Sequence, residues 1–275
     1  MSSKVTRYNH SIDKDTRALI STRYKRITKA VNSEFWDSTS ETAHSRYVGS
    51  YGRGTAINTS DIDVLVELPD EEYEHFTTLT GNGQSRLLQA VKNAILETYP
   101  NTDVKGDGQV VVVNFSDEMK FEILPAFKNI GLWTGWDGTY YYPNTHIGGN
   151  WMTTNPIAEQ NAMDDKDSYN NSNGLLKDTC KHIRYIRSES FNSYHLSGIL
   201  IDSFVYAAIG NWHWLRENEQ GGYNEKTYEQ ALLDYYNNNF PYASLIAPVI
   251  YTPGSGMKVG TDDWEVLGKV LNKMV

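Results

Sequence analysis

The chain has 275 residues, of which 39% are hydrophobic, so it is long enough for two lobes and apolar enough to build a core. Its net charge of −9 argues against a protein that wraps long nucleic acid, because the phosphate backbone is bound by cationic surface. The single cysteine, Cys180, excludes an intramolecular disulfide and a cysteine-based zinc site, and it fits a reducing cytoplasm. The polar N-terminal residues predict no signal peptide, and no apolar run reaches the ~18 residues of a membrane span.

The first part of the chain shows helix and strand patterns in turn. Apolar residues at a loose helical spacing predict a long helix over about 11–36, and a short strand is expected at 46–48. A glycine-rich segment, 49–54, precedes a predicted strand at 61–68 that ends before a proline. A helix over 84–99 is also expected to end at a proline.

The next segment contains a predicted hairpin and a predicted loop. Residues 109–115 and 119–124 are rich in Val, Ile and Phe, and the turn-like sequence between them predicts a β-hairpin. Residues 129–155 are dense in Gly, Asn, Tyr and Trp, which predicts a long irregular loop with one strand near 140–142.

Helical patterns dominate after residue 155. Asn155 suits a helix cap and Pro156 the first helical position. Further helices are expected at about 173–188, 196–215, 225–237 and 261–274. The shift in pattern predicts a lobe of residues 1–155, with a mixed sheet braced by the first helix, and a helical lobe of residues 156–275. The expected fold class is therefore a two-lobed α+β protein.

Two acids open the strand that follows the glycine-rich segment. Residues i and i+2 of a strand share a face, so Asp61 and Asp63 project together while Ile62, Val64 and Val66 face the opposite side. Adjacent carboxylates repel each other, and no fixed positive charge is expected beside them. A divalent cation would resolve the repulsion. Ligation by oxygen alone suits Mg²⁺, with Mn²⁺ as an alternative.

A third acid, Glu122, lies on the second strand of the predicted hairpin. It alternates with Phe121 and Ile123, so it faces the acidic site if those two residues are core. Three carboxylates could hold two metal ions, one activating an attacking hydroxyl and the other steadying a triphosphate and its leaving pyrophosphate. The alternative is an outward-facing hairpin residue for Glu122 and an ordinary solvated strand end for the two aspartates.

The glycine-rich segment adds a site for phosphate. Gly49 and Ser50 would let backbone amides and one hydroxyl approach the terminal phosphates of a nucleotide. The segment is not a Walker loop, because no Gly-Lys-Ser/Thr follows, and a flexible turn is the alternative.

Gly49-Ser50, Asp61-x-Asp63 and Glu122 together resemble the polymerase-β-like nucleotidyltransferase superfamily. The strings GSYGRGTAINTSDIDVLVEL and FEILPAF are similar to bacterial CD-NTases, the SMODS-domain synthases of cyclic oligonucleotides that are related to cyclic GMP-AMP synthase and oligoadenylate synthase. This resemblance implies a polymerase-β-like fold with nucleotides bound between the lobes. It also implies a product, a cyclic di- or trinucleotide made from ATP, GTP or other nucleoside triphosphates, that activates an effector protein in anti-phage (CBASS) signalling.

The resemblance extends to the helical lobe. It implies that Lys181 and Arg184 grip the donor phosphates and that Ser193 and Tyr194 contact phosphate and base. Glu122 and Arg184 depart from the family pattern, which usually has aspartate and lysine there. The longer Glu122 can still ligate a metal, and arginine binds phosphate as a fork. A solvated helix face for the two basic residues and a core position for Tyr194 are the alternatives.

The residues and the resemblance together predict a monomeric cytoplasmic enzyme that requires neither long nucleic acid nor membrane. One rival is a toxin-like nucleotidyltransferase that modifies transfer RNA, which the acidic balance disfavours. The other is a non-catalytic nucleotide-sensing module, which the three acids disfavour. The sequence leaves open the bases, the ring size and the linkage of the product.

Overall fold

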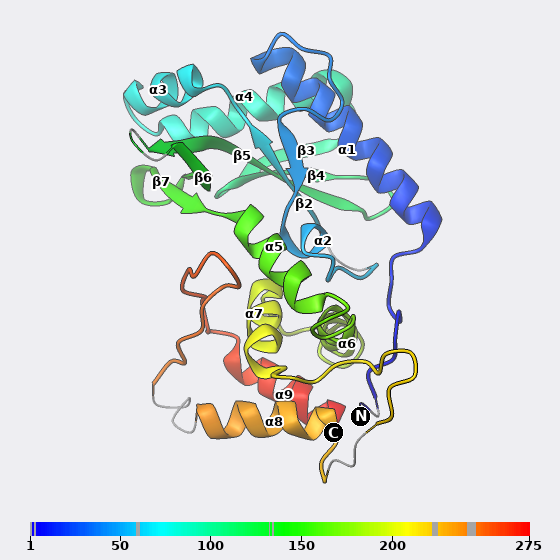
Figure 1. Cartoon of the computed structure of the whole chain (residues 1–275). Helices are drawn as coiled ribbons and strands as arrows, with labels where there is room; N and C mark the ends of the chain where they lie inside the picture. Colours follow the sequence, from blue (N-terminus) through cyan, green and yellow to red (C-terminus); the bar gives the residue numbers. More distant parts are fainter. Residues whose placement is uncertain are drawn as a thin grey trace. The chain divides into compact units, whose positions relative to one another are not determined.

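The computed structural model describes residues 2, 4–58, 61–131, 133, 135–221, 225–240 and 246–275. The chain packs into two compact units, which are described separately (Figure 1). The sheet unit comprises Asp13–Gly52 and Ser60–Ile157, and the helical unit comprises Met1–Ile12, Arg53–Thr59 and Ala158–Val275. The helical unit is thus assembled from three separate stretches of chain, whereas the sequence patterns suggest two continuous lobes divided near residue 155.

The long first helix is confirmed as α1, Lys14–Phe35. Its N-terminus is capped by Asp13, whose carboxylate accepts a hydrogen bond of 2.8 Å from the backbone amide of Thr16. Ile20, Ile27 and Val31 form its buried face. The helix packs against α4, Gly83–Thr98, and both contact strands of the sheet.

The sheet unit holds a seven-stranded mixed sheet, as predicted (Figure 1). Its main path runs β1-β2-β5-β4-β3, with β6 and β7 continuing from β5. Only β2 and β5 pair in parallel; every other pair that the structure describes is antiparallel. The strands are β1 Ser45–Tyr47, β2 Ile62–Glu67, β3 Asp103–Asp107, β4 Val110–Asn114, β5 Lys120–Gly131, β6 Gly135–Asn144 and β7 Asn150–Thr154.

The predicted hairpin is confirmed, but its second strand is much longer than expected. β5 continues through Pro125, a residue that cannot donate a backbone hydrogen bond. Pro125 lies where the antiparallel partner of β5 changes, because β4 pairs with residues 120–123 and β6 pairs from Phe127 onward. On its antiparallel side Pro125 therefore falls between two ladders, while on its other side it pairs with Val66 of β2.

The loop predicted for residues 129–155 is wrong. The segment contains the end of β5, the strands β6 and β7, and a short 3₁₀ turn, His146–Gly148; Leu132 and Thr134 lie outside the described residues. Tyr140 of β6 is buried with Val48, Leu65 and Ala126. Most of the aromatic residues that suggested a loop are thus strand residues, and the one strand expected near 140–142 is confirmed within β6.

Two short helices of the sheet unit have weak sequence signals. α2, Gly49–Gly52, lies within the glycine-rich segment. α3, Asp70–Thr78, buries only Phe76, so it lacks the apolar periodicity that would predict a helix.

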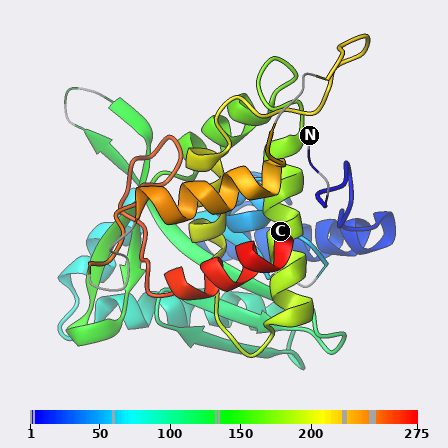
Figure 2. The ribbon, with the colours of Figure 1, turned by 90° about the horizontal axis from the view of Figure 1, so that it is seen from below.

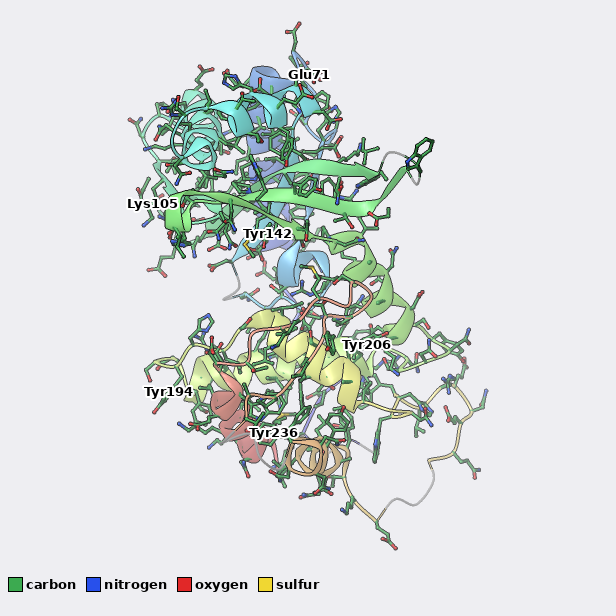
Figure 3. All side chains as sticks on the ribbon, turned by 90° about the vertical axis from the view of Figure 1, so that its left-hand side faces the viewer. Glu71, Lys105, Tyr142, Tyr194, Tyr206 and Tyr236 are labelled. Atoms are coloured by element: carbon green, nitrogen blue, oxygen red, sulfur yellow. The ribbon has the colours of Figure 1, made fainter. Side chains whose placement is uncertain are left out.

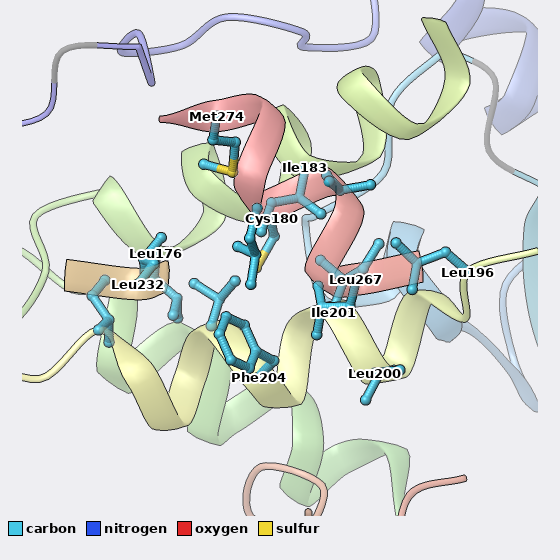
Figure 4. Packing of buried hydrophobic residues seen from close by; sticks show 14 of the residues in the cluster. Leu176, Cys180, Ile183, Leu196, Leu200, Ile201, Phe204, Leu232, Leu267 and Met274 are labelled. Carbon is cyan, nitrogen blue, oxygen red and sulfur yellow. The ribbon is translucent and has the colours of Figure 1, made fainter. Parts of the chain in front are cut away.

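The helices expected after residue 155 are confirmed in type, as α5 Pro156–Asp167, α6 Leu175–Ser190, α7 Gly198–Ala208, α8 Tyr228–Asn239 and α9 Trp264–Met274. α7 is shorter than the expected 196–215, and the chain turns at Gly210, which has a φ of +54°. Figure 2 shows α8 and α9 side by side. Cys180, Phe204 and Leu267 are among the buried residues that join α6, α7 and α9 (Figure 4). No helix among the described residues is long and apolar enough to cross a membrane.

Candidate active site

The two aspartates lie at the start of β2. Asp61 immediately precedes the strand and is exposed, and Asp63 is its second residue and is half-buried. Ile62, Val64 and Val66 are buried, as the alternation predicts. The charged residues thus stand where the strand emerges from the core.

Glu122 lies beside Asp63 on the neighbouring strand. The parallel register of β2 and β5 pairs Asp63 directly with Glu122, which puts their backbones about 4.8 Å apart. Phe121 and Ile123 are fully buried, so the expected condition for Glu122 to face the acidic site is met. The sheet therefore brings the predicted acids together from positions far apart in the sequence.

Lys120 binds two of the three acids, which the sequence reasoning missed. Its Nζ lies 2.6 Å from Glu122 Oε1 and 3.1 Å from Asp61 Oδ2. Partial burial alone would lower the pKa of Lys120, but hydrogen bonds to Glu122 and Asp61 outweigh it and raise the pKa. The expectation that no fixed positive charge lies near the acids is therefore wrong. The only local signal was that Lys120 lies two positions before Glu122, on the same face of the strand.

The glycine-rich segment lies against the second aspartate. The backbone amide of Val48 donates a 2.9 Å hydrogen bond to the carbonyl of Asp63. Gly49 follows with a φ of +57°, and a Cβ added there would lie 1.8 Å from Asp63 Oδ2. A side chain at this position would therefore displace the carboxylate. Ser50 is the second residue of α2 and is half-buried.

The carboxylate oxygens of Asp61, Asp63 and Glu122 are of the type that binds a divalent cation. Carboxylate oxygens are the ligands that Mg²⁺ prefers, and the Lys120 ammonium already bridges two of them as a cation would. In the conformation described, no three acidic, histidine or cysteine side chains among the described residues converge into a ready metal cluster. A metal held by Asp61, Asp63 and Glu122 would share two of these carboxylates with Lys120 or displace it from them.

Arg184 of α6 has a different role from the predicted phosphate contact. It is buried, and its guanidinium donates to both carboxylate oxygens of Asp202, at 2.7 and 3.0 Å, and to the carbonyls of Cys180 and Gly198. These partners occupy the guanidinium within the helical unit. A phosphate would have to displace the Asp202 carboxylate from a buried site, so the geometry argues against the prediction for Arg184.

Asp202 is the centre of a buried network that the sequence analysis did not assign. Besides Arg184, it accepts 2.9 Å hydrogen bonds from Arg53 Nε and Thr55 Oγ1, and Arg53 also pairs with Glu159 at 3.1 Å. Burial alone would raise the pKa of Asp202, but the two guanidiniums outweigh burial and lower the pKa to about 2. An aspartate within the apolar sequence of α7 was the available signal, because a buried acid requires a partner.

The other predicted residues of the helical unit lie nearer the surface. Lys181 is half-buried on α6, and Ser193 is exposed in the turn before α7. Tyr194 is 45% exposed rather than core (Figure 3). One side of its ring faces the Lys269 ammonium at 4.5 Å. That these residues act with the three acids stays a prediction, since the acids belong to the other unit.

Comparisons with known proteins agree on one family. The family described as Second Messenger Oligonucleotide or Dinucleotide Synthetase domain (SMODS) matches residues 2–167. A cyclic AMP-AMP-AMP synthase from Acinetobacter sp. is 24% identical over 217 residues, which make up 77% of this chain and 57% of the relative. The chain thus spans little more than half the length of this curated relative.

Solved structures share the fold. The CdnE cyclic dinucleotide synthase of Elizabethkingia meningoseptica with GTP and Apcpp has a TM-score of 0.60 at 13% identity, covering 96% of this chain and 97% of that one. The STING-associated CdnE c-di-GMP synthase of Capnocytophaga granulosa has a TM-score of 0.62 at 14% identity, covering 94% and 80%.

Proposed function

The chain belongs to the SMODS domain family and has the polymerase-β-like fold of its CD-NTase relatives, and on that premise we propose that it is a template-independent nucleotidyltransferase. Its product would be a cyclic di- or trinucleotide made from nucleoside triphosphates with release of pyrophosphate. The observation that carries the proposal is the pairing of Asp63 with Glu122 across parallel strands, with Gly49 against the Asp63 carboxylate.

The proposed reaction is in-line transfer of a nucleotidyl group to a ribose hydroxyl. Asp61, Asp63 and Glu122 would hold Mg²⁺, which supplies charge neutralisation for the triphosphate and acidifies the attacking hydroxyl. The missing side chain of Gly49 leaves room for the Asp63 carboxylate to lie against the backbone, and the Ser50 hydroxyl would donate to phosphate oxygens. Most of the catalysis then comes from positioning and charge, because the protein forms no covalent bond.

The helical unit would supply the nucleotide contacts that remain. The exposed ring of Tyr194 suits stacking on a base, and Lys181 and Ser193 suit phosphate oxygens. Arg184 is left out of this set because Asp202 occupies its guanidinium. The named relatives support purine nucleotides as substrates, since one is a synthase of cyclic AMP-AMP-AMP and another was solved with GTP and Apcpp.

Membership of the family supports a proposal for the cellular setting. We propose a cytoplasmic monomer whose cyclic product acts as a second messenger on an effector protein in anti-phage defence. A nucleotidyltransferase that labels transfer RNA is the rival that the same site would permit, and its product separates it from a cyclase.

The test is to identify the products of the purified protein. It is incubated with Mg²⁺ and α-labelled nucleoside triphosphates, and the products are treated with phosphatase and weighed by mass spectrometry. A cyclic product keeps all of its label, because every labelled phosphate lies in a phosphodiester. Release of label from a 5′ end would contradict cyclisation, and labelling that requires added RNA would favour the rival. Absence of turnover in every condition would contradict both.

A further inference from the structure

Lys120 has a place in the acidic site that the proposed reaction does not yet use. It is the first residue of β5 and lies two positions before Glu122, so both side chains project from the same face of the strand. Its ammonium reaches Glu122 on its own strand and Asp61 before β2. All three side chains are partly exposed, so the contacts are open to exchange with solvent ions.

A second lysine on the same strand gives the comparison. Lys128 pairs with Glu67 at 2.9 Å, and its side chain is 33% exposed, against 34% for Lys120. Eight residues of strand separate the two lysines by roughly 25 Å. Lys128 therefore matches Lys120 in strand and exposure and also pairs with an acid, but that acid is outside the acidic site. It differs in having one acidic partner and in lying 4.8 Å from the centre of the Trp136 ring.

We propose that Lys120 is a positioning residue that acts as an internal counter-cation and competes with the divalent metal for Asp61 and Glu122. The inference rests on the proposed metal-dependent function. The pairing of Asp63 with Glu122 brings negative charges close together. While the metal is absent, the Lys120 ammonium offsets the repulsion between these carboxylates. Because the ammonium occupies one oxygen of Asp61 and one of Glu122, a metal that uses the same oxygens must displace Lys120 from them.

The competition has a defined sign and size. Replacing Lys120 with a neutral side chain should tighten metal binding, since the metal no longer has to displace a cation. The gain should be about three- to tenfold, because partly exposed ion pairs are weak. The same variant should unfold at a lower temperature without metal, because the carboxylates lose their counter-cation, and added metal should restore much of that loss.

The experiment measures Mn²⁺ binding to the full chain without nucleotide, by electron paramagnetic resonance of the free ion. Lys120→Met is compared with the wild type, with Lys120→Arg, which keeps the charge, and with Lys128→Met, the matched control. Asp63→Asn identifies which bound Mn²⁺ belongs to the acidic site. We expect tighter binding in Lys120→Met alone, and binding within about twofold of the wild type in the other two lysine variants. Lys120→Gln serves as the neutral variant if Lys120→Met folds poorly.

Three outcomes would overturn the inference. Equal or weaker Mn²⁺ binding in Lys120→Met would show that Lys120 does not compete, and the proposed function would stand if the protein still makes its cyclic product. Equal tightening in Lys120→Met and Lys128→Met would reduce the effect to net charge. If Asp63→Asn binds as much Mn²⁺ as the wild type, the acids do not form a metal site. That result would contradict both the inference and the proposed mechanism.

Discussion

The protein has two clusters of paired charges that differ in their exposure to solvent. In the sheet unit, Asp61, Lys120 and Glu122 have side-chain exposures of 49%, 34% and 27%. In the helical unit, Asp202 is completely buried between Arg53 and Arg184. A partly exposed pair contributes roughly 0–1 kcal/mol and exchanges partners readily, whereas removing one member of a buried pair costs about 3–5 kcal/mol. Exposure therefore separates charges that are available to a ligand from charges that hold a fold.

The largest effect is expected from Asp63→Asn. This change removes a charge from the proposed metal site while keeping the shape of the side chain, so turnover should fall by about a thousandfold or more. The measurement is cyclic product formed per minute at saturating triphosphate and Mg²⁺. Asp107→Asn, an exposed position on β3, serves as the control and should leave turnover unchanged. Near-normal activity in Asp63→Asn would show that the acidic site is not the active site.

The buried cluster should respond in stability rather than in chemistry. Asp202→Asn leaves two guanidiniums without their buried anion, and the free energy of unfolding should fall by about 3–5 kcal/mol. Urea unfolding measures this loss. Asp117→Asn is the matched control, since Asp117 also pairs with an arginine, Arg23, but is largely exposed, and its loss should stay below about 1 kcal/mol. Similar losses of stability in both variants would show that burial does not determine how much these ion pairs contribute.

The pH dependence of the Asp202 effect has a definite sign. The pKa of Asp202 is about 2 in the folded protein, below the value of about 3.9 in an unfolded chain. The stability that its ionised form contributes is therefore fully present above about pH 4 and is lost as the pH falls toward 2. The wild type and Asp202→Asn should accordingly differ most near neutral pH and converge in acid.

Glu122 sharpens the prediction for the acidic site. Glu122→Gln loses the charge and should reduce turnover by about a hundredfold, whereas Glu122→Asp keeps both oxygens and should retain measurable activity. Mg²⁺ titrations of both variants test the difference. Turnover in Glu122→Gln equal to that of the wild type would show that Glu122 binds no metal.

Gly49→Ala should produce a smaller loss that combines strain with displacement. The added Cβ would overlap the Asp63 carboxylate, so turnover should fall by about tenfold or more and stability by about 1–3 kcal/mol. Gly81→Ala is the control, because Gly81 has a φ of +88° and nothing within 4 Å of an added Cβ. Both variants should lose stability, but only Gly49→Ala should lose activity.

Tyr194→Ala carries the smallest expected effect. One side of the ring already faces Lys269, so the loss in nucleotide affinity should be near the low end of a base-stacking contact, about 1 kcal/mol or fivefold. Equilibrium binding of a non-hydrolysable triphosphate measures it, with Tyr194→Phe expected to match the wild type. Unchanged affinity in Tyr194→Ala would remove this turn from the nucleotide site.

Local patterns in the sequence were sufficient to predict the features of the acidic site that depend only on residues close together in the chain. The alternation of Ile62, Val64 and Val66 predicts both the strand and the shared face of its acids, because a two-residue period is a local property. The contact between Lys120 and Asp61 depends on the register of two strands 59 residues apart, so no local pattern could reveal it. That a lysine precedes a predicted ligand by two positions is visible in the sequence, but its partner is not.

Arg184 shows that a local pattern also cannot identify the partner of a charged side chain on a helix. A basic residue on a helix has the same periodicity whether it binds phosphate or a buried acid. The decision comes from Asp202, which is 18 residues further along, and from the packing that buries both. The full length of β6 and all of β7 were missed for a related reason, although the strand expected near 140–142 lies within β6. Aromatic residues beside glycine predict a loop unless a neighbouring strand is known to pair with them.

The contact between Arg53 and Asp202 also sets an order of events during synthesis. The two residues are 149 positions apart, and the ribosome adds about 5–20 residues per second, so Arg53 waits roughly 7–30 seconds for its partner to be made. The other buried acidic partner of Arg53, Glu159, is made 43 residues before Asp202, so the two contacts of Arg53 become possible in that order. The strands of the sheet unit are complete before Asp202 is translated, and the helical unit can close around residues 53–58 only afterwards. Nascent chains halted between these two points should therefore protect the sheet from protease while leaving Arg53 open to cleavage.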